Sequence, residues 1–154
     1  MSSVGMNIGG TTAQERIFAS ELCKRFGLER IRFANSGTEA NLHALQAAKI
    51  FTGKRKVVAF GGGYHGGVLG FAGGKPGRNT IDIYEWIVAR YNDLEDAKRA
   101  IQSEGVAAVL LEGMQGAGGC ICGSPEFLRG IQQAANEVGD YAQVAPKTYA
   151  HLAT

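Results

Sequence analysis

Two uninterrupted apolar runs, separated by segments with helical spacing, limit the folds open to this chain more than any other feature. The runs span residues 57–60 and 106–111. A strand that is apolar at every position is typical of a mostly parallel sheet whose two faces are both covered. Because helix and strand patterns alternate along the chain, the sequence predicts an α/β fold with helices packed on both faces of that sheet.

Local signals set the other expected elements. Helices are predicted at 12–26, 38–51, 93–103 and 125–138, with capping signals such as Ser36 three places before Glu39 and Ser124 before Pro125. Residues 31–34 and 87–91 are expected to be strands, and 68–86 an excursion over the surface. After residue 139 an alternating fold needs another apolar strand. Residues 140–154 show no period, so no strand is predicted there.

The composition excludes several classes of protein. Of 154 residues, 45% are hydrophobic and 19% charged, and the net charge of +2 gives no reason to expect a nucleic-acid partner. No apolar run approaches the length of a membrane-spanning helix, so no membrane partner is expected either. Three cysteines, Cys23, Cys120 and Cys122, indicate free thiols and hence the cytoplasm. They predict no metal site, because no second cysteine or histidine pair stands at ligand spacing.

The first candidate site lies where the expected strand 31–34 turns into a helix. Ser36, Gly37 and Thr38 stand at this turn. Glycine lets a ligand approach the backbone, and the start of a helix offers unpaired N–H groups and a dipole that favours an anion. Thr38 adds a hydroxyl donor. On this motif alone, plain capping of the helix by Ser36 is the more common explanation.

Two further candidates follow the apolar strands. Tyr64 and His65 stand in a glycine-rich loop after residue 60, where open α/β sheets bind ligands, and a tyrosine there can stack on a planar ring. The alternative is a loop with the tyrosine packed beneath it. Glu112 ends the second apolar run and can orient a ligand, or it can be an ordinary solvated charge at a strand end.

Taken in order, these motifs resemble one family. The run Asn-Ser-Gly-Thr-Glu-Ala-Asn from residue 35, the loop at 64–66, and the strand ending in Glu112 before Gly-Gly-Cys-Ile at 118–121 are similar to class-III aminotransferases of the fold-type-I pyridoxal-phosphate family. The strongest likeness is to glutamate-1-semialdehyde 2,1-aminomutases. The resemblance implies that residues 1–139 form part of a three-layer αβα large domain, with residues 140–154 as an unmatched tail.

The resemblance also implies site roles, with pyridoxal 5′-phosphate as cofactor. Ser36, Gly37 and Thr38 fall on the loop that holds its phosphate. Tyr64 falls on the aromatic residue that stacks on its ring, with His65 beside it, and Glu112 falls on an acidic residue near the active site. An amine or amino-acid substrate and a homodimer are implied for intact members of the family.

Departures from the family pattern limit the expected activity. The aspartate that pairs with the pyridine nitrogen and the lysine that forms the Schiff base with the cofactor have no counterpart here. We therefore expect a partial chain that is inactive alone and does not attach the cofactor covalently. The alternative is a non-catalytic module that binds a phosphorylated ligand or pairs with a longer relative. A truncated gene product is a third explanation.

Overall fold

A computed structural model of the chain describes residues 12–139 and 142–144. Internal contacts divide the chain into two compact units, with the division between Ala34 and Asn35. The described part of the first unit contains the helix α1, Ala13–Phe26. Thr12 and Glu15 form a capping box at its start, and Gly27 ends it with a left-handed φ of 60°. The helix predicted at 12–26 is confirmed.

The strand predicted at 31–34 is wrong. These residues are irregular and pair with none of the strands in the described part of the chain. Within this unit the ring of Phe33 instead stacks on Phe18 of α1, with 5.3 Å between the ring centroids. A short apolar segment becomes a strand only if another strand takes up its backbone hydrogen bonds, and local sequence cannot supply that partner.

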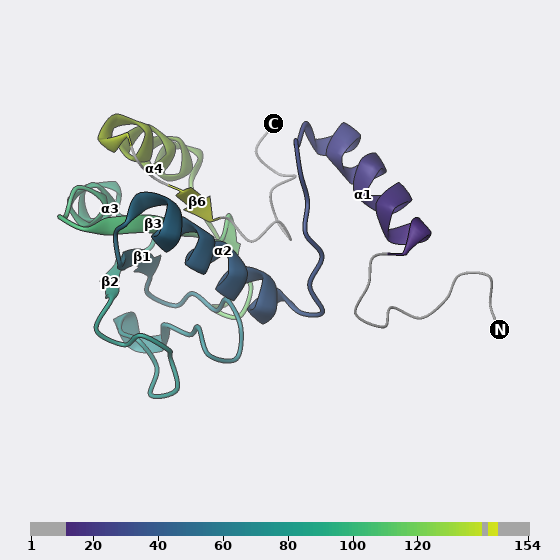
Figure 1. Cartoon of the computed structure of the whole chain (residues 1–154). Coiled ribbons are helices and arrows are strands. Elements are labelled where there is room, and N and C mark those ends of the chain that lie inside the picture. Colours follow the sequence, from purple (N-terminus) through teal and green to yellow (C-terminus); the bar gives the residue numbers. More distant parts are fainter. Residues whose placement is uncertain (1–11, 140–141, 145–154) are drawn as a thin grey trace. The chain divides into compact units, whose positions relative to one another are not determined.

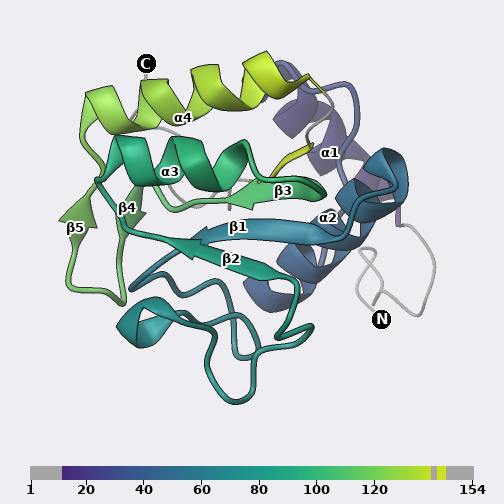
Figure 2. The ribbon, with the colours of Figure 1, turned by 90° about the vertical axis from the view of Figure 1, so that its left-hand side faces the viewer.

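The second unit is built around a four-stranded sheet. Its order is β2 (Trp86–Ala89), β1 (Lys56–Phe60), β3 (Val106–Leu110) and β6 (Ala142–Val144), and all neighbouring pairs are parallel. The helix α2, Gly37–Thr52, covers one face, and α3 (Leu94–Ile101) and α4 (Pro125–Val138) lie together over the other (Figures 1 and 2). The predicted α/β fold, in three layers, is confirmed.

Two apolar clusters occupy the spaces between sheet and helices. On the side of α3 and α4 the buried side chains include Val58, Phe60, Ile101, Phe127 and Ile131. On the side of α2 they include Leu45, Val57, Ala108 and Leu110. The strands β1 and β3 are thus buried on both faces, which is why their sequences are apolar without alternation.

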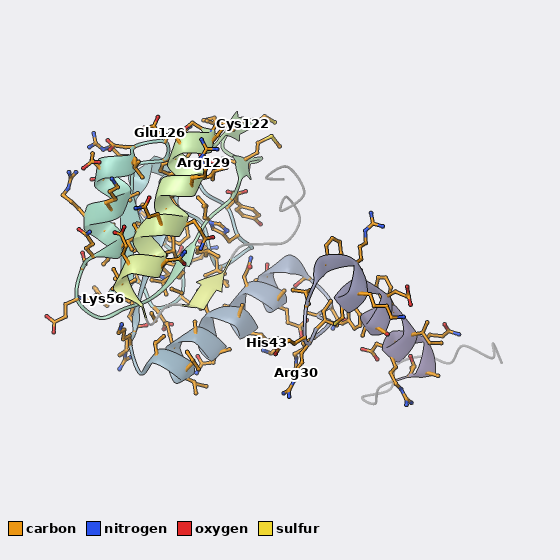
Figure 3. All side chains as sticks on the ribbon, turned by 90° about the horizontal axis from the view of Figure 1, so that it is seen from above. Arg30, His43, Lys56, Cys122, Glu126 and Arg129 are labelled. Carbon is orange, nitrogen blue, oxygen red and sulfur yellow. The ribbon has the colours of Figure 1, made fainter. Side chains whose placement is uncertain are left out.

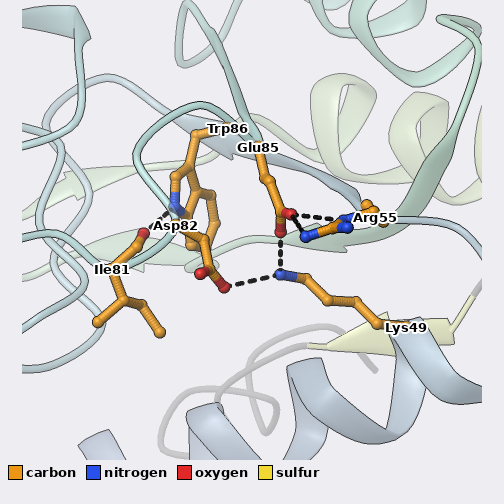
Figure 4. Close-up of polar contacts among 6 residues, drawn as sticks. All are labelled: Lys49, Arg55, Ile81, Asp82, Glu85 and Trp86. Atoms are coloured by element: carbon orange, nitrogen blue, oxygen red, sulfur yellow. Dashed lines mark hydrogen bonds and ion pairs between the residues drawn. The ribbon is translucent and has the colours of Figure 1, made fainter.

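The segment 68–86 only partly matches its prediction. It contains the 3-10 turn η1, Ala72–Gly74, but Leu69 and Phe71 are fully buried, so the expectation of a surface excursion is wrong for these two residues. Ion pairs hold its far end to α2. The ammonium of Lys49 contacts the carboxylates of Asp82 and Glu85, and the Arg55 guanidinium lies 2.7 Å from Glu85 (Figure 4).

The prediction that no strand follows α4 is also wrong. The strand β6 pairs with β3 from Ala108 to Leu110. A three-residue strand needs only backbone hydrogen bonds to a strand already in place, so it requires no periodic pattern of its own.

A small antiparallel hairpin, which contains the Gly-Gly-Cys-Ile motif at 118–121, adds to the edge where the strands end. It is made of β4 (Met114–Gln115) and β5 (Ile121–Cys122). Lys56, at the start of β1, and Cys122, in this hairpin, lie at opposite ends of the second unit (Figure 3). In the described residues, no helix has the length and apolar character needed to cross a membrane.

Candidate functional site

Three segments meet near the carboxyl ends of β1 and β3. Residues 61–67 follow β1, residues 112–119 follow β3, and the first turn of α2 contacts the loop after β1. Loops that follow parallel strands leave from the same edge of the sheet, and this is where open α/β sheets bind ligands. Candidate residues that are far apart in the sequence are therefore brought together.

Two side-chain hydrogen bonds shape the first turn of α2. The Oγ of Ser36 accepts a hydrogen bond of 3.2 Å from the Glu39 N–H, and a carboxylate oxygen of Glu39 accepts one of 2.9 Å from the Asn35 N–H. Glu39 thus reaches one residue further back than a strict capping box requires. The N–H groups of Gly37 and Thr38 have no partner inside the helix. A Cβ atom added at Gly37 would meet nothing within 4 Å, so the space beside this turn is open.

Thr38 also binds the loop that follows β1. Its Oγ1 accepts a hydrogen bond of 3.1 Å from the Gly67 N–H, which leaves the hydroxyl proton available to a second acceptor. Gly66, with a φ of +137°, packs directly against Thr38, and a Cβ added there would lie 2.8 Å from the Thr38 Cα. Only glycine allows so close an approach in this backbone conformation.

Glu112 supports the same loop from the end of β3. One of its carboxylate oxygens accepts a 3.1 Å hydrogen bond from the Tyr64 N–H. Burial raises the pKa of Glu112, while the N–H groups of Tyr64 and Gly116 lower it, and the net shift is upward. Glu112 is 7% exposed, so the solvated strand-end charge considered above does not describe it. The Tyr64 side chain is 54% exposed, which leaves surface free for stacking.

His65 does not project from the loop into solvent. Its side chain is buried, and its ring packs edge-on against Phe71 at 6.1 Å. Burial lowers the pKa of His65 to about 4, so the imidazole is neutral at pH 7. Its Nδ1 has no hydrogen-bond partner among the described residues. The position of His65 beside Tyr64 is as predicted, but its imidazole lies in the core beneath the loop.

Two buried amides at the site were missed from the sequence. The Nδ2 of Asn41 donates to the His65 carbonyl at 2.7 Å, and the Nε2 of Gln115 donates to the Gly61 carbonyl at 2.9 Å. A partial signal existed for Asn41, because it stands three residues after Thr38 and so shares a helix face with it. For Gln115 the sequence held no comparable signal.

The groups gathered at this site suit a particular kind of ligand. Unpaired N–H groups and a hydroxyl suit a phosphate or another oxyanion. The exposed ring of Tyr64 offers a flat surface on a loop that Glu112 and Thr38 hold by its backbone. A planar molecule that carries a phosphate matches both features.

Proteins with similar sequences include a transaminase and an aminomutase. The chain is 49% identical over 138 residues to a β-phenylalanine transaminase of Variovorax paradoxus, covering 88% of this chain and 31% of the relative. It is 35% identical over 150 residues to a glutamate-1-semialdehyde 2,1-aminomutase of Desulfitobacterium hafniense, covering 88% and 35%. The aminomutase likeness is therefore the weaker of the two, contrary to the prediction.

The structural comparison agrees. The crystal structure of a β-phenylalanine aminotransferase from Variovorax paradoxus superposes with a TM-score of 0.84 at 46% identity, over 92% of this chain and 33% of that one. The chain thus spans about a third of the length of these relatives. The sequence model of the class-III aminotransferases matches residues 2–140. This chain belongs to the class-III aminotransferase family.

Proposed function

We propose that this chain provides the phosphate-binding turn and the ring-stacking loop of a pyridoxal-phosphate site for amino-group transfer between an amine and a carbonyl carbon. Pyridoxal 5′-phosphate is the cofactor that the family implies, and when bound it supplies an electron sink for bonds broken at the amine carbon. The observation that supports the proposal most directly is the hydrogen bond from Gly67 to Thr38. It joins the open helix N-terminus to the loop that carries Tyr64.

Each predicted residue has a distinct proposed role. The N–H groups of Gly37 and Thr38, with the Thr38 hydroxyl, would bind the phosphate, and Ser36 would keep the turn in shape through its cap to Glu39. Tyr64 would lie against the pyridine ring. Glu112 would hold the backbone of Tyr64, and His65 would support the loop from beneath.

The substrate is proposed to be an amine or an amino acid. The higher identity to the β-phenylalanine transaminase, 49% against 35% for the aminomutase, favours a transaminase over an aminomutase. We place the protein in the cytoplasm on account of its free thiols, and propose a homodimer for the assembled enzyme. A non-catalytic module that binds a phosphorylated ligand, or that pairs with a longer relative, is the second candidate, because the open turn at Gly37 suits any phosphate.

Binding of pyridoxal phosphate to this chain tests the cofactor role. Equilibrium dialysis should detect saturable binding, and Thr38→Val should weaken it about tenfold. The variant loses a hydrogen bond to the charged phosphate and the hydrogen bond that Thr38 accepts from the Gly67 N–H. Thr52→Val is the matched control, since the Thr52 hydroxyl caps the other end of α2 through the Ala48 carbonyl. Equal affinities for the two variants would contradict the proposed site.

Borohydride reduction tests whether the cofactor is bound covalently. We expect reversible binding, so that borohydride reduction followed by peptide mass spectrometry finds no cofactor on a lysine of this chain. A reduced cofactor on one particular lysine would show instead that the chain carries its own covalent attachment point.

A comparison of two ligands separates the two candidate functions. Binding of inorganic phosphate and pyridoxal phosphate with equal affinity would favour the general phosphate-binding module, because the Tyr64 ring would then contribute nothing.

A further inference from the structure

Three backbone N–H groups of the loop at 64–67 donate hydrogen bonds to the rest of the second unit. The Tyr64 N–H donates to Glu112, the His65 N–H donates to the Leu69 carbonyl at 2.8 Å, and the Gly67 N–H donates to Thr38. The carbonyls of Gly66 and Gly67 accept hydrogen bonds from the Leu69 N–H and the Asn79 side chain. The carbonyl of His65 accepts one from the side-chain amide of Asn41, which is the contact made by a buried side chain of α2.

Asn41 is well placed to act on the loop. Its side chain is 6% exposed, and its Nδ2 lies 2.7 Å from the carbonyl oxygen of His65. It stands one helical turn after Thr38 on the same face of α2. Successive turns of one helix therefore hold two nearby loop residues, His65 through a donor and Gly67 through an acceptor.

We propose that Asn41 is a positioning residue that locks the Tyr64 loop to the first turn of α2. Its amide keeps the ring of Tyr64 at a fixed distance from the N–H groups of Gly37 and Thr38. A ligand with a ring and a phosphate then meets both contacts without first ordering the loop. The consequence for cofactor affinity rests on the proposed function, but the locking of the loop does not.

The chemistry of the contact requires a donor. The His65 carbonyl can only accept, so leucine at position 41, similar in shape to asparagine, would leave a buried oxygen without its partner. An ionised carboxylate there would place a second acceptor against the first. Serine keeps a donor on a shorter arm and should fall between wild type and leucine.

The test compares Asn41→Leu, Asn41→Asp and Asn41→Ser with the control Gln46→Glu. The control also changes an amide to an acid on α2, at an exposed position. Amide hydrogen exchange, followed by mass spectrometry, is measured in a peptide covering 63–67 and in α4. We expect exchange in the loop to be about tenfold faster in Asn41→Leu and Asn41→Asp, with little change in α4 and none in the control.

Cofactor affinity is the second measurement on the same proteins. The dissociation constant for pyridoxal phosphate should rise about tenfold in Asn41→Leu and Asn41→Asp and stay unchanged in Gln46→Glu. If Asn41→Leu fails to fold, as judged by circular dichroism, Asn41→Ser provides the comparison, with a smaller increase in both quantities.

The outcomes distinguish the inference from the proposed function. Faster exchange to the same extent in the loop and in α4 would overturn the positioning role, since the residue would then stabilise the whole unit. An unchanged loop in all Asn41 variants would overturn it as well. If the wild-type chain binds no pyridoxal phosphate, the proposed function fails, while the exchange measurement still decides the role of Asn41.

Discussion

The imidazole of His65 lies under the candidate site as a neutral group in an apolar setting. Burial lowers its pKa from 6.5 to about 4, so the unfolded chain binds a proton more readily than the folded one in this interval. Stability is therefore retained above pH 6.5 and lost as the pH falls toward 4. The shift corresponds to at most about 3.5 kcal/mol.

This pH dependence can be measured by urea unfolding between pH 7 and pH 4.5. The unfolding free energy should fall more steeply toward low pH in the wild type than in His65→Phe. Glu112, whose pKa is raised, contributes in the opposite direction in both proteins, so the difference between the two curves reports His65. Glu85 and Asp96 have pKa values below their usual range, so their own contributions are lost only at lower pH. Parallel curves for wild type and His65→Phe would rule out this role for the imidazole.

Gly66 sets the closest approach between the loop and α2. Gly66→Ala should destabilise the fold by about 2 kcal/mol or more, because the new methyl group meets the Thr38 backbone at a φ of +137°. Gly67→Ala is a demanding control. Its added Cβ would meet nothing within 4 Å, and thermal unfolding should barely change. Equal losses at the two positions would mean that the approach of Gly66 to Thr38 is not tight in solution.

At the residue scale the sequence revealed the groups that carry chemistry but not the groups that hold them. Thr38, Tyr64 and Glu112 were predicted from turn and strand-end positions, and the structure brings them together. Asn41 and Gln115 were not predicted as site residues, because their importance comes from burial against a loop that is distant in sequence. Even the burial of His65 depends on Phe71, in a segment expected at the surface.

At the element scale, the cluster of Lys49, Asp82 and Glu85 ties the segment before β2 to α2. Glu85→Gln should lower the unfolding free energy by about 1–2 kcal/mol, because two cations lose a partner that is 17% exposed. Glu95→Gln, which breaks an exposed pair with Lys98, should cost less than about 0.5 kcal/mol. Denaturant unfolding of both variants gives the comparison, and equal losses would show that the cluster adds nothing beyond a surface pair.

Helices were predicted better than strands for a physical reason. Each helix start carries its own cap within a few residues, as Ser124 does for α4 by accepting a hydrogen bond from Phe127 at 3.1 Å. Strands depend on partners elsewhere in the chain. Hence the segment 31–34 looked like a strand and is not one, while β6 was missed although it pairs with β3.

For the molecule as a whole, alternation of patterns was enough to predict a parallel sheet between helices. The alternation could not predict the strand order β2-β1-β3-β6, because every order of parallel strands satisfies the same apolar pattern. The sequence also did not predict which apolar side chains the fold leaves exposed. Ile50 and Phe51, at the end of α2, are 73% and 82% exposed and lie side by side in sequence. Exposed apolar groups that adjoin one another favour association.

Self-association of the isolated chain is the expected result. The sedimentation coefficient of the wild type should rise with concentration, and the double change Ile50→Gln with Phe51→Gln should reduce that rise, since it removes apolar surface without touching a buried group. Tyr84→Gln is the control, because Tyr84 is 98% exposed and belongs to another segment, before β2. A wild type that sediments as a monomer at every concentration would contradict the prediction. A rise that persists unchanged in the double variant would place the contact surface elsewhere on the chain.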